Sequence, residues 1–329
     1  MRALQINEYG GTNALTNVTR EVPTPKKGQV LIKVAAAACN PSDLAFLDGN
    51  YGIVKKVPVI PGFVGSGTVV ASGGGIFANY LNGKRVACSS PVTGQGTWAE
   101  YMVSDANGCI PLRKNVDFEF GANMIVNPLT AVALLDLARR NGHKAVVQNA
   151  AASALGQMII RLARTYGLPT INLVRRAEQV ELLKNIGAEV VINTAEDGWE
   201  KELKRDCNQL NATVAFDAIA GEMTEQMAAV MPFGSTVTVY GGLSGEASML
   251  SPASSIFRGQ TVNGFWLTSW LGQKKIWDLI TLSNRVQGKL KDALATPIRQ
   301  RYGLEQAIEG IKAYETTMTA GKILITPGK

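Results

Sequence analysis

The chain has 329 residues, 46% of them hydrophobic and 18% charged, a composition typical of a folded globular protein with room for two domains. No apolar run reaches the roughly 18 residues of a membrane span, so a membrane partner is not expected. The net charge of +7 reflects either scattered solvated charge or an anionic partner such as a dinucleotide, coenzyme A or an acidic carrier protein. Basic residues interleaved with aromatics do not stand out, so nucleic acid is not an expected partner.

The first part of the chain is rich in glycine and in short strand-like runs. The pattern predicts strands over Ala3–Asn7, Gln29–Ala37, Gly67–Ala71, Lys84–Ala87 and Trp98–Val103. Turn residues separate these runs, as in Asp48-Gly49-Asn50 and Ser72-Gly73-Gly74-Gly75. Short strands with such separators predict a small, twisted, barrel-like domain.

From about Gly121 the chain alternates between strands and helices. The predicted strands are Ala145–Asn149, Thr170–Val174, Glu189–Ile192, Thr213–Asp217, Ser235–Tyr240 and Thr261–Phe265. The predicted helices include Leu129–Arg140, Gln157–Tyr166, Glu178–Ile186 and Met223–Val230. This alternation predicts an α/β fold with a doubly wound parallel sheet.

The last segment is predicted to hold two helices, near Ile276–Gln287 and Leu304–Thr316, and a closing strand, Lys322–Ile325. We expect that strand to return to the first domain, which makes the first domain discontinuous. The expected domains are therefore residues 1–120 together with 270–329, and residues 121–269.

The four cysteines (Cys39, Cys88, Cys109 and Cys207) lie far apart and form no Cys-x-x-Cys pair. This spacing argues against a structural zinc site and a disulfide framework, and it favours a reducing compartment such as the cytoplasm. The first six residues already follow a strand pattern, so we expect no signal or transit peptide in this sequence.

The unit from Lys144 to Arg176 has the form strand, small-residue turn, helix, strand. Such a turn lets a phosphate approach the backbone N–H groups and the positive end of the helix dipole. Arg175 and Arg176 end the second strand. At this position an acidic residue would bind a free ribose hydroxyl, whereas an arginine pairs with a 2′-phosphate. The two arginines therefore predict NADPH rather than NADH. Ala154 occupies a glycine position of the dinucleotide fingerprint, and an ordinary crossover packed against its sheet remains the alternative.

A further set of motifs carries a resemblance to a known family. The motifs are Asn-Pro-Ser-Asp (40–43), Gly-Asn-Tyr-Gly (49–52), Gln-Asn-Ala (148–150), Tyr-Gly-Gly (240–242) and Gly-Phe-Trp-Leu-Thr-Ser-Trp (264–270). With them, the whole chain resembles the medium-chain dehydrogenase/reductase superfamily, in the zinc-independent branch of quinone oxidoreductases and mitochondrial-type trans-2-enoyl-thioester reductases. The resemblance implies a GroES-like β-rich barrel domain and a Rossmann domain. The last motif favours the enoyl reductases.

The zinc-dependent members of that superfamily place a His-Glu pair after Pro-Gly, where this chain has Phe63 and Val64. Neither side chain binds a metal. The four-cysteine zinc lobe is also missing between Cys88 and Trp98, and the single histidine, His143, is interpreted as a surface loop residue. We therefore expect no metal site.

The resemblance implies a site, residue by residue. Tyr51 would be the catalytic residue, although a packed loop tyrosine is the alternative. The NADPH contacts would be Asn127, Ala152, Ser153, Ala154, Leu155, Arg175, Arg176, Tyr240, Gly241, Gly242, Leu243, Phe265, Trp266, Leu267, Thr268 and Lys322. Two departures from the enoyl reductases concern the 2′-phosphate: Arg176 replaces an acid, and Ala177 replaces a basic residue. Trp270 is interpreted as a core aromatic.

The implied activity is NADPH-dependent reduction of an activated C=C bond, most directly that of an enoyl-CoA or enoyl-carrier thioester, as in fatty acid metabolism. Hydride reaches the β-carbon while the neutral phenol of Tyr51 stabilises the enolate. The alternatives are an NADPH:quinone oxidoreductase with the same site and a non-catalytic NADPH-binding protein. Lys55 and Lys56 either serve a coenzyme A phosphate or are solvated surface. A homodimer, paired near Thr261–Phe265, is also implied.

Overall fold

The computed structural model describes residues 1–318 and 321–328, which form two compact units. One unit comprises Met1–Val126 and Ser283–Lys329, and the other comprises Asn127–Leu282. The second unit extends past the expected residue 269 because strand β13 (Thr261–Gly264) is followed at once by helix α9 (Leu267–Gly272). Residues 319, 320 and 329 of the expected first domain lie outside the described residues.

The first unit contains a seven-stranded sheet with the order β14-β15-β3-β4-β5-β7, in which β6 also pairs with β3, and a two-stranded sheet of β1 and β2. The strands are β1 (Arg2–Ile6), β2 (Leu15–Thr19), β3 (Gln29–Ala38), β4 (Val64–Ser72), β5 (Arg85–Ser89), β6 (Tyr101–Asp105), β7 (Cys109–Pro111), β14 (Ile298–Tyr302) and β15 (Lys322–Ile325). Only the β14–β15 pair is parallel among the pairs described here. The β-rich, barrel-like domain is thereby confirmed.

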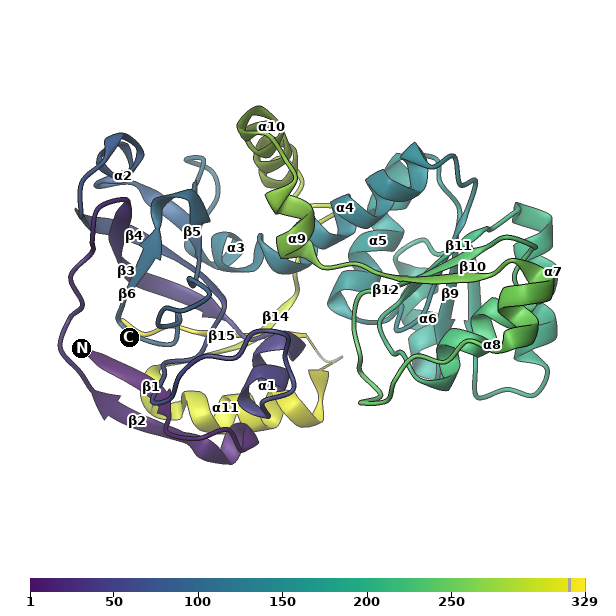
Figure 1. The fold of residues 1–329 in the computed structure, drawn as a ribbon, viewed down its shortest axis with the longest axis horizontal. Coiled ribbons are helices and arrows are strands. Elements are labelled where there is room, and N and C mark those ends of the chain that lie inside the picture. Colours follow the sequence, from purple (N-terminus) through teal and green to yellow (C-terminus); the bar gives the residue numbers. More distant parts are fainter. Residues whose placement is uncertain (319–320, 329) are drawn as a thin grey trace. The chain divides into compact units, whose positions relative to one another are not determined.

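Strand β15 returns to this sheet from the end of the chain, as predicted. It pairs antiparallel with β3, with Leu324 opposite Ala38. Helix α11 (Leu304–Thr316), drawn in yellow in Figure 1, packs against β1 and β2. Fully buried side chains at the centre of the unit include Leu4, Ile32, Phe46, Trp98 and Met102.

Several short elements of this unit were not predicted. They are helices α1 (Pro41–Leu47), α2 (Ile76–Leu81) and α3 (Phe118–Asn123) and strands β2, β7 and β14. Each is too short to show a clear hydrophobic period, and each depends on local contacts instead. Helix α1, for example, begins with a capping box in which Asn40 and Asp43 exchange side-chain and backbone hydrogen bonds.

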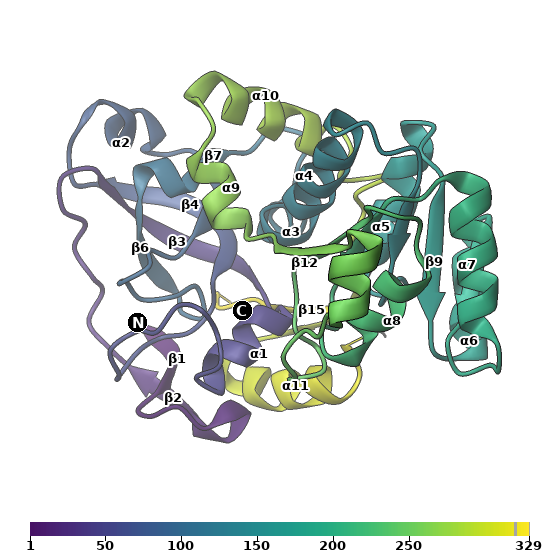
Figure 2. The same ribbon diagram turned by 45° about the vertical axis from the view of Figure 1, so that its right-hand side comes forward.

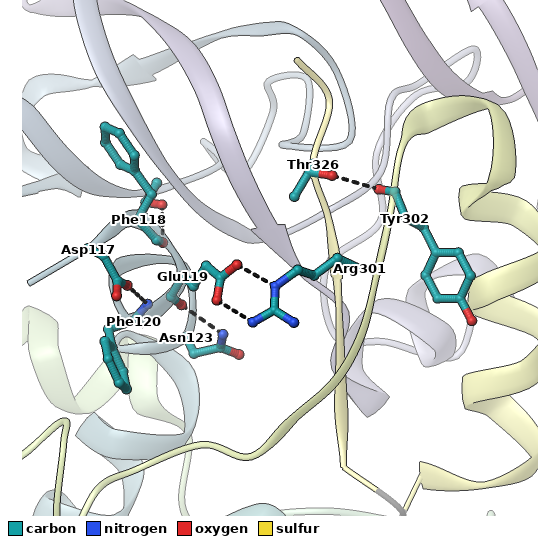
Figure 3. A network of polar contacts seen from close by, with 9 residues as sticks. Asp117, Phe118, Glu119, Phe120, Asn123, Arg301, Tyr302 and Thr326 are labelled. Carbon is teal, nitrogen blue, oxygen red and sulfur yellow. Dashed lines mark hydrogen bonds and ion pairs between the residues drawn. The ribbon is translucent and has the colours of Figure 1, made fainter. Parts of the chain in front are cut away.

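Helix α3 is joined to β14 by polar contacts (Figure 3). The Nε and Nη2 atoms of Arg301 donate to the Glu119 carboxylate. The backbone carbonyl of Phe118 accepts a hydrogen bond from the Ser66 hydroxyl. Nearby, the Thr326 hydroxyl donates to the Tyr302 carbonyl at 3.2 Å. These contacts connect the amino-terminal and carboxy-terminal parts of the first unit.

The second unit contains six parallel strands in the order β10-β9-β8-β11-β12-β13. The strands before β13 are β8 (Val146–Gln148), β9 (Thr170–Val174), β10 (Val190–Asn193), β11 (Val214–Asp217) and β12 (Thr236–Val239). The helices are α4 (Val126–Arg140), α5 (Ala154–Thr165), α6 (Ala177–Asn185), α7 (Trp199–Leu210), α8 (Glu222–Val230), α9 and the first part of α10 (Ile276–Gln287). Helix α7 packs against β9 (Figure 2), and helices α6 and α7 both pack against β10. The six predicted strands and the doubly wound sheet are confirmed.

No helix in the described part of the chain is long and apolar enough to cross a membrane.

Candidate functional site

Four of the predicted cofactor-binding segments follow the carboxyl ends of parallel strands in the second unit. Residues 152–155 follow β8, residues 175 and 176 follow β9, residues 240–243 follow β12, and residues 265–268 follow β13. Carboxyl ends of parallel strands meet at one edge of a sheet, where α/β proteins bind their ligands. Asn127 belongs to the same unit, in the first turn of α4, and is half-buried.

The turn between β8 and α5 is shaped by small residues. Ala150 adopts a left-handed φ of 46°, and the Ser153 hydroxyl caps α5 by accepting the Gly156 N–H at 3.1 Å. A Cβ on Gly156 would lie 2.4 Å from the Ala151 carbonyl oxygen, so glycine lets the helix approach the preceding turn this closely. The helix begins at Ala154 rather than Gln157, which explains why alanine replaces a glycine there.

The beginning of α5 is suited to an anion. The backbone N–H groups of Ala154 and Leu155, in the first helical turn, have no acceptor within the helix. The helix dipole adds partial positive charge at the same place. A pyrophosphate fits this chemistry without any side-chain charge.

The two predicted arginines after β9 differ in their partners. Both are exposed. The Arg176 side chain forms an ion pair with Glu178, with 3.0 Å between Nε and Oε1. No carboxylate among residues 1–318 and 321–328 pairs with the Arg175 guanidinium. The backbone N–H of Arg175 donates to the Gln179 side-chain oxygen at 3.2 Å. Arg175 is therefore the arginine better placed to bind a phosphate.

The loop after β12 contains a buried hydroxyl. The Tyr240 hydroxyl has no hydrogen-bond partner in the described part of the chain, and burial raises the pKa of this phenol above its ordinary value. A Cβ on Gly241 would lie 2.8 Å from the Ala218 carbonyl oxygen, whereas Gly242 faces open space. The backbone at Gly242 is therefore the part of this loop with open space beside it.

The loop after β13 lines a hollow of about 480 Å³, together with Leu137 of α4. Phe265 is half-buried there, and Trp266 is 48% exposed. Trp270 is buried and its ring centroid lies 6.4 Å from that of Phe265, consistent with its interpretation as a core aromatic. Leu267 is half-buried and Thr268 is exposed.

Tyr51 belongs to the first unit, in the loop after α1, and is half-buried. Its ring packs against that of Phe63, with 5.0 Å between the centroids. The backbone of Phe63 is held on both sides: its N–H donates to Asp43 at 2.8 Å, and its carbonyl accepts the Ser90 N–H at 2.8 Å. The ring that supports Tyr51 is thereby fixed in position.

The first unit also buries two ionisable residues, Asp43 and Lys322, whose burial the sequence did not reveal. Burial raises the pKa of Asp43 to about 6, although its carboxylate accepts the N–H groups of Phe63 and Asn40. Burial lowers the pKa of Lys322 to about 8. The Lys322 ammonium donates to the Cys39 carbonyl, the Asn40 side-chain oxygen and the Tyr314 hydroxyl at 3.0, 2.8 and 3.0 Å. All three donors are thus occupied within the first unit, so a contact with a dinucleotide would have to replace one of them.

Lys55 is a second buried lysine in the first unit. Its side chain is directed inward, and burial lowers the pKa of its ammonium to about 8. The interpretation of the loop as solvated surface is therefore wrong for Lys55, whereas Lys56 is exposed. The alternation of exposed and buried residues from Gly52 to Lys56 depends on tertiary contacts, so the sequence offered no signal to distinguish the two lysines.

No group of three or more His, Cys, Asp or Glu residues that could hold a metal exists within residues 1–318 and 321–328. The ring of Phe63 occupies the position at which the zinc enzymes carry histidine. His143 is half-buried, and its Nδ1 lies 2.7 Å from the Thr213 hydroxyl.

Two family models match this chain. The alcohol dehydrogenase GroES-like domain matches residues 26–114, and the zinc-binding dehydrogenase model matches residues 154–283. The second model takes its name from zinc, but the positions discussed above lack the zinc ligands.

The known proteins described here as similar to the chain are named as enoyl reductases or as a quinone reductase. A mitochondrial enoyl-[acyl-carrier-protein] reductase of Arabidopsis thaliana is 32% identical, over 88% of this chain and 78% of the relative. The human enzyme of the same name is 30% identical, over 82% of this chain and 73% of the relative. The crystal structure of a putative NADPH:quinone reductase from Mesorhizobium loti is 36% identical, with a TM-score of 0.93, and covers 99% of this chain and 98% of its own.

Proposed function

Because the chain belongs to the medium-chain dehydrogenase/reductase superfamily, in its quinone oxidoreductase and enoyl reductase branch, we propose that it reduces trans-2-enoyl-CoA or enoyl-carrier thioesters with NADPH. The chain is an oxidoreductase of that family. The observation that supports reduction of an activated acceptor is the position of Tyr51, a phenol whose ring packs against that of Phe63. The segment from Gly264 to Trp270, which resembles the enoyl reductases, favours the thioester over the quinone.

The residues after β8, β9 and β12 fit a dinucleotide phosphate. The open N–H groups at the start of α5 suit the pyrophosphate, and the Arg175 guanidinium suits a 2′-phosphate. The open space beside Gly242 suits the approach of a ligand to the loop after β12. These features support NADPH over NADH, because NADH has no phosphate for Arg175 to bind. The contributions of Asn127, residues 265–268 and Lys322 remain predictions.

The proposed chemistry requires a hydrogen-bond donor where negative charge develops. When bound, NADPH supplies the hydride that is added to the β-carbon. The electron pair of the C=C bond then moves to the thioester oxygen, and the Tyr51 hydroxyl donates a hydrogen bond to this enolate. A proton from Tyr51 or from water then reaches the α-carbon and completes the saturated thioester.

A quinone is the second candidate acceptor. It is favoured by the 36% identity with the Mesorhizobium loti protein, whose description is a putative NADPH:quinone reductase. Hydride addition to a quinone also leaves negative charge on an oxygen that Tyr51 can stabilise. The non-catalytic alternative depended on Ala154, which the helix accommodates as its first residue.

We also propose a homodimer formed through β13. This strand lies at the edge of the six-stranded sheet, and an unpaired edge readily accepts another strand. Phe233 and Phe257 are 76% and 78% exposed, and the Phe233 ring is near Gly259, which precedes β13. Light scattering after size exclusion measures the mass, and a monomer would contradict this proposal. The cytoplasmic location stays a prediction.

The test of function is NADPH consumption with crotonyl-CoA, a longer trans-2-enoyl-CoA and an ortho-quinone. Thioester turnover that collapses in Tyr51→Phe supports the enoyl reductase. If only the quinone is turned over, the substrate class is a quinone and not a thioester. Bound NADPH with no turnover of any acceptor would contradict both catalytic proposals.

A further inference from the structure

Two adjacent lysines after Tyr51 have opposite environments. Lys56 is exposed, whereas Lys55 is only 6% exposed. The Tyr9 hydroxyl holds the Lys55 backbone from both sides, because it accepts the N–H at 2.8 Å and donates to the carbonyl at 2.7 Å. This clamp directs the Lys55 side chain into the first unit.

The buried ammonium of Lys55 has only neutral hydrogen-bond acceptors. It donates to the Ser90 hydroxyl at 2.7 Å and to the Gly94 carbonyl at 2.9 Å. No carboxylate in the described part of the chain forms an ion pair with it. Two of its three N–H donors are thus used, and its charge is not neutralised by direct contact. Burying a cation without a counter-ion is unfavourable for folding, which points to a role beyond stability.

The same ring connects Lys55 to Tyr51. The Lys55 Nζ lies 5.7 Å from the centroid of the Phe63 ring, and the Tyr51 ring centroid lies 5.0 Å from that centroid. The ammonium and the tyrosine ring therefore both pack near the same aromatic ring. Charges separated by protein attract more strongly than charges separated by solvent.

We propose that Lys55 supplies positive charge to the acceptor site, where it stabilises the negative charge that forms on the acceptor oxygen at Tyr51. This inference rests on the proposed function, because it takes the acceptor oxygen to bind at Tyr51. Hydride from NADPH forms the new C–H bond, and the electron pair of the C=C bond moves to the oxygen. A proton from Tyr51 or water later forms the second C–H bond. Lys55 keeps its own proton throughout and acts by charge alone.

The protonation of Lys55 makes this charge dependent on pH. Burial lowers the pKa of the ammonium to about 8, and the charge of Asp43 opposes part of that change. The two groups that accept its hydrogen bonds, the Ser90 hydroxyl and the Gly94 carbonyl, carry no charge. Activity that needs the ammonium is therefore present below pH 8 and is lost as the pH rises above it.

The kinetic test compares four variants with the wild type on whichever acceptor is turned over. Lys55→Met and Lys55→Gln remove the charge, and Lys55→Gln can still donate to Ser90. Both should lower kcat/KM about tenfold and abolish its decline above pH 8. Lys55→Arg should keep the activity at higher pH, because arginine stays protonated. Lys56→Met, which removes an exposed charge from the same loop, should match the wild type.

Folding is monitored in the same variants. Lys55→Gln removes the charge and keeps a donor for Ser90, so it should melt close to the wild-type temperature. A purely structural role predicts instead a lower melting temperature with an unchanged pH profile. Equal kcat/KM and equal pH profiles in Lys55→Gln and the wild type would overturn the proposal.

A second test needs neither cofactor nor turnover. 4-Nitrophenol is a chromophoric oxygen acid whose anion resembles an enolate, and its absorbance reports its ionisation on the protein. A site with positive charge should lower the pKa of bound 4-nitrophenol, and Lys55→Gln should raise that pKa by about one unit relative to wild type. The proposal would be overturned if bound 4-nitrophenol had the same pKa in the wild type and in Lys55→Gln. It would also be overturned if Tyr51→Phe did not change the binding of 4-nitrophenol. If the pKa difference of 4-nitrophenol is observed but the protein turns over no acceptor with NADPH, only the proposed function is contradicted.

Discussion

The rings of Tyr51 and Phe63 pack against each other with 5.0 Å between their centroids and 41° between their planes. Phe63 is itself fixed through hydrogen bonds of its backbone to Asp43 and Ser90. A phenol supported in this way loses little conformational freedom when it binds an acceptor. Under the proposed function, Phe63 supports the hydrogen-bond donor Tyr51 at the sequence position where the zinc enzymes have a metal ligand.

The hydroxyl of Tyr51 can be removed without removing the ring contact. Tyr51→Phe should lower kcat/KM for the enoyl thioester about 100-fold or more, because a donor to the developing enolate is lost. The melting temperature should change little, since the contact with Phe63 is kept. Tyr80→Phe, at an exposed tyrosine of α2, is the control and should behave like the wild type. Full activity of Tyr51→Phe would exclude a catalytic role for the phenol.

The two arginines after β9 should contribute unequally to cofactor choice. Arg175→Ala should weaken NADPH binding about tenfold or more and leave NADH binding unchanged, because only NADPH carries the 2′-phosphate. Arg176→Ala should have the smaller effect, since Arg176 also pairs with Glu178. Fluorescence titration of both cofactors measures the affinities. Equal losses for NADPH and NADH in Arg175→Ala would contradict this assignment.

Gly156 should be needed for the close contact of α5 with the turn at Ala151. In Gly156→Ala, the new methyl group would lie 2.4 Å from the Ala151 carbonyl oxygen, so we expect a loss of about 1–3 kcal/mol in unfolding free energy. Gly272→Ala, in α9, meets no atom within 4 Å and serves as the matched control. Urea denaturation of both variants provides the comparison. Equal stabilities would show that the helix can shift at little cost.

The buried ammonium of Lys322 predicts a specific dependence of stability on pH. Its pKa is about 8 in the folded protein, below its ordinary value of 10.5, so between these values the unfolded chain binds a proton that the folded chain does not. The contribution of Lys322 to the unfolding free energy therefore rises as the pH goes from 8 to 10.5. Lys322→Met should remove this rise.

The same variant should also be less stable at pH 7, by about 3 kcal/mol, because Asn40, Tyr314 and the carbonyl of Cys39 lose their buried donor. Thermal unfolding from pH 6 to 10 measures both effects. Parallel curves for the wild type and the variant would show that Lys322 has the same pKa in both states.

Much of the second unit could be predicted from the sequence because its signals are local. Strands β8, β9, β10 and β11 are short, mostly apolar runs, and each is bounded by a periodic helix or a turn. The predicted phosphate turn and the arginines after β9 are positioned by those same strands. Helix α7 was missed, although its buried residues Trp199, Leu203 and Cys207 follow helical spacing.

The first unit was less predictable because its short elements depend on distant contacts. Strand β14, for example, pairs with β15 and is exposed at its centre, so its sequence lacks a buried strand's pattern. The burial of Asp43 and Lys322 joins residues from opposite ends of the chain. Such pairs have no spacing in the sequence that a local pattern could detect.

The sequence by itself determined the family, the alternation of strands and helices, and the absence of zinc ligands at Phe63 and Val64, because these depend on residue type and near neighbours. Only the tertiary structure decided between two identical residues, Lys55 and Lys56. The Tyr9 hydroxyl turns one inward to Ser90 and Gly94 and leaves the other in solvent. A charge in the interior is stabilised by contacts that chain folding brings together, and residue type does not specify those contacts.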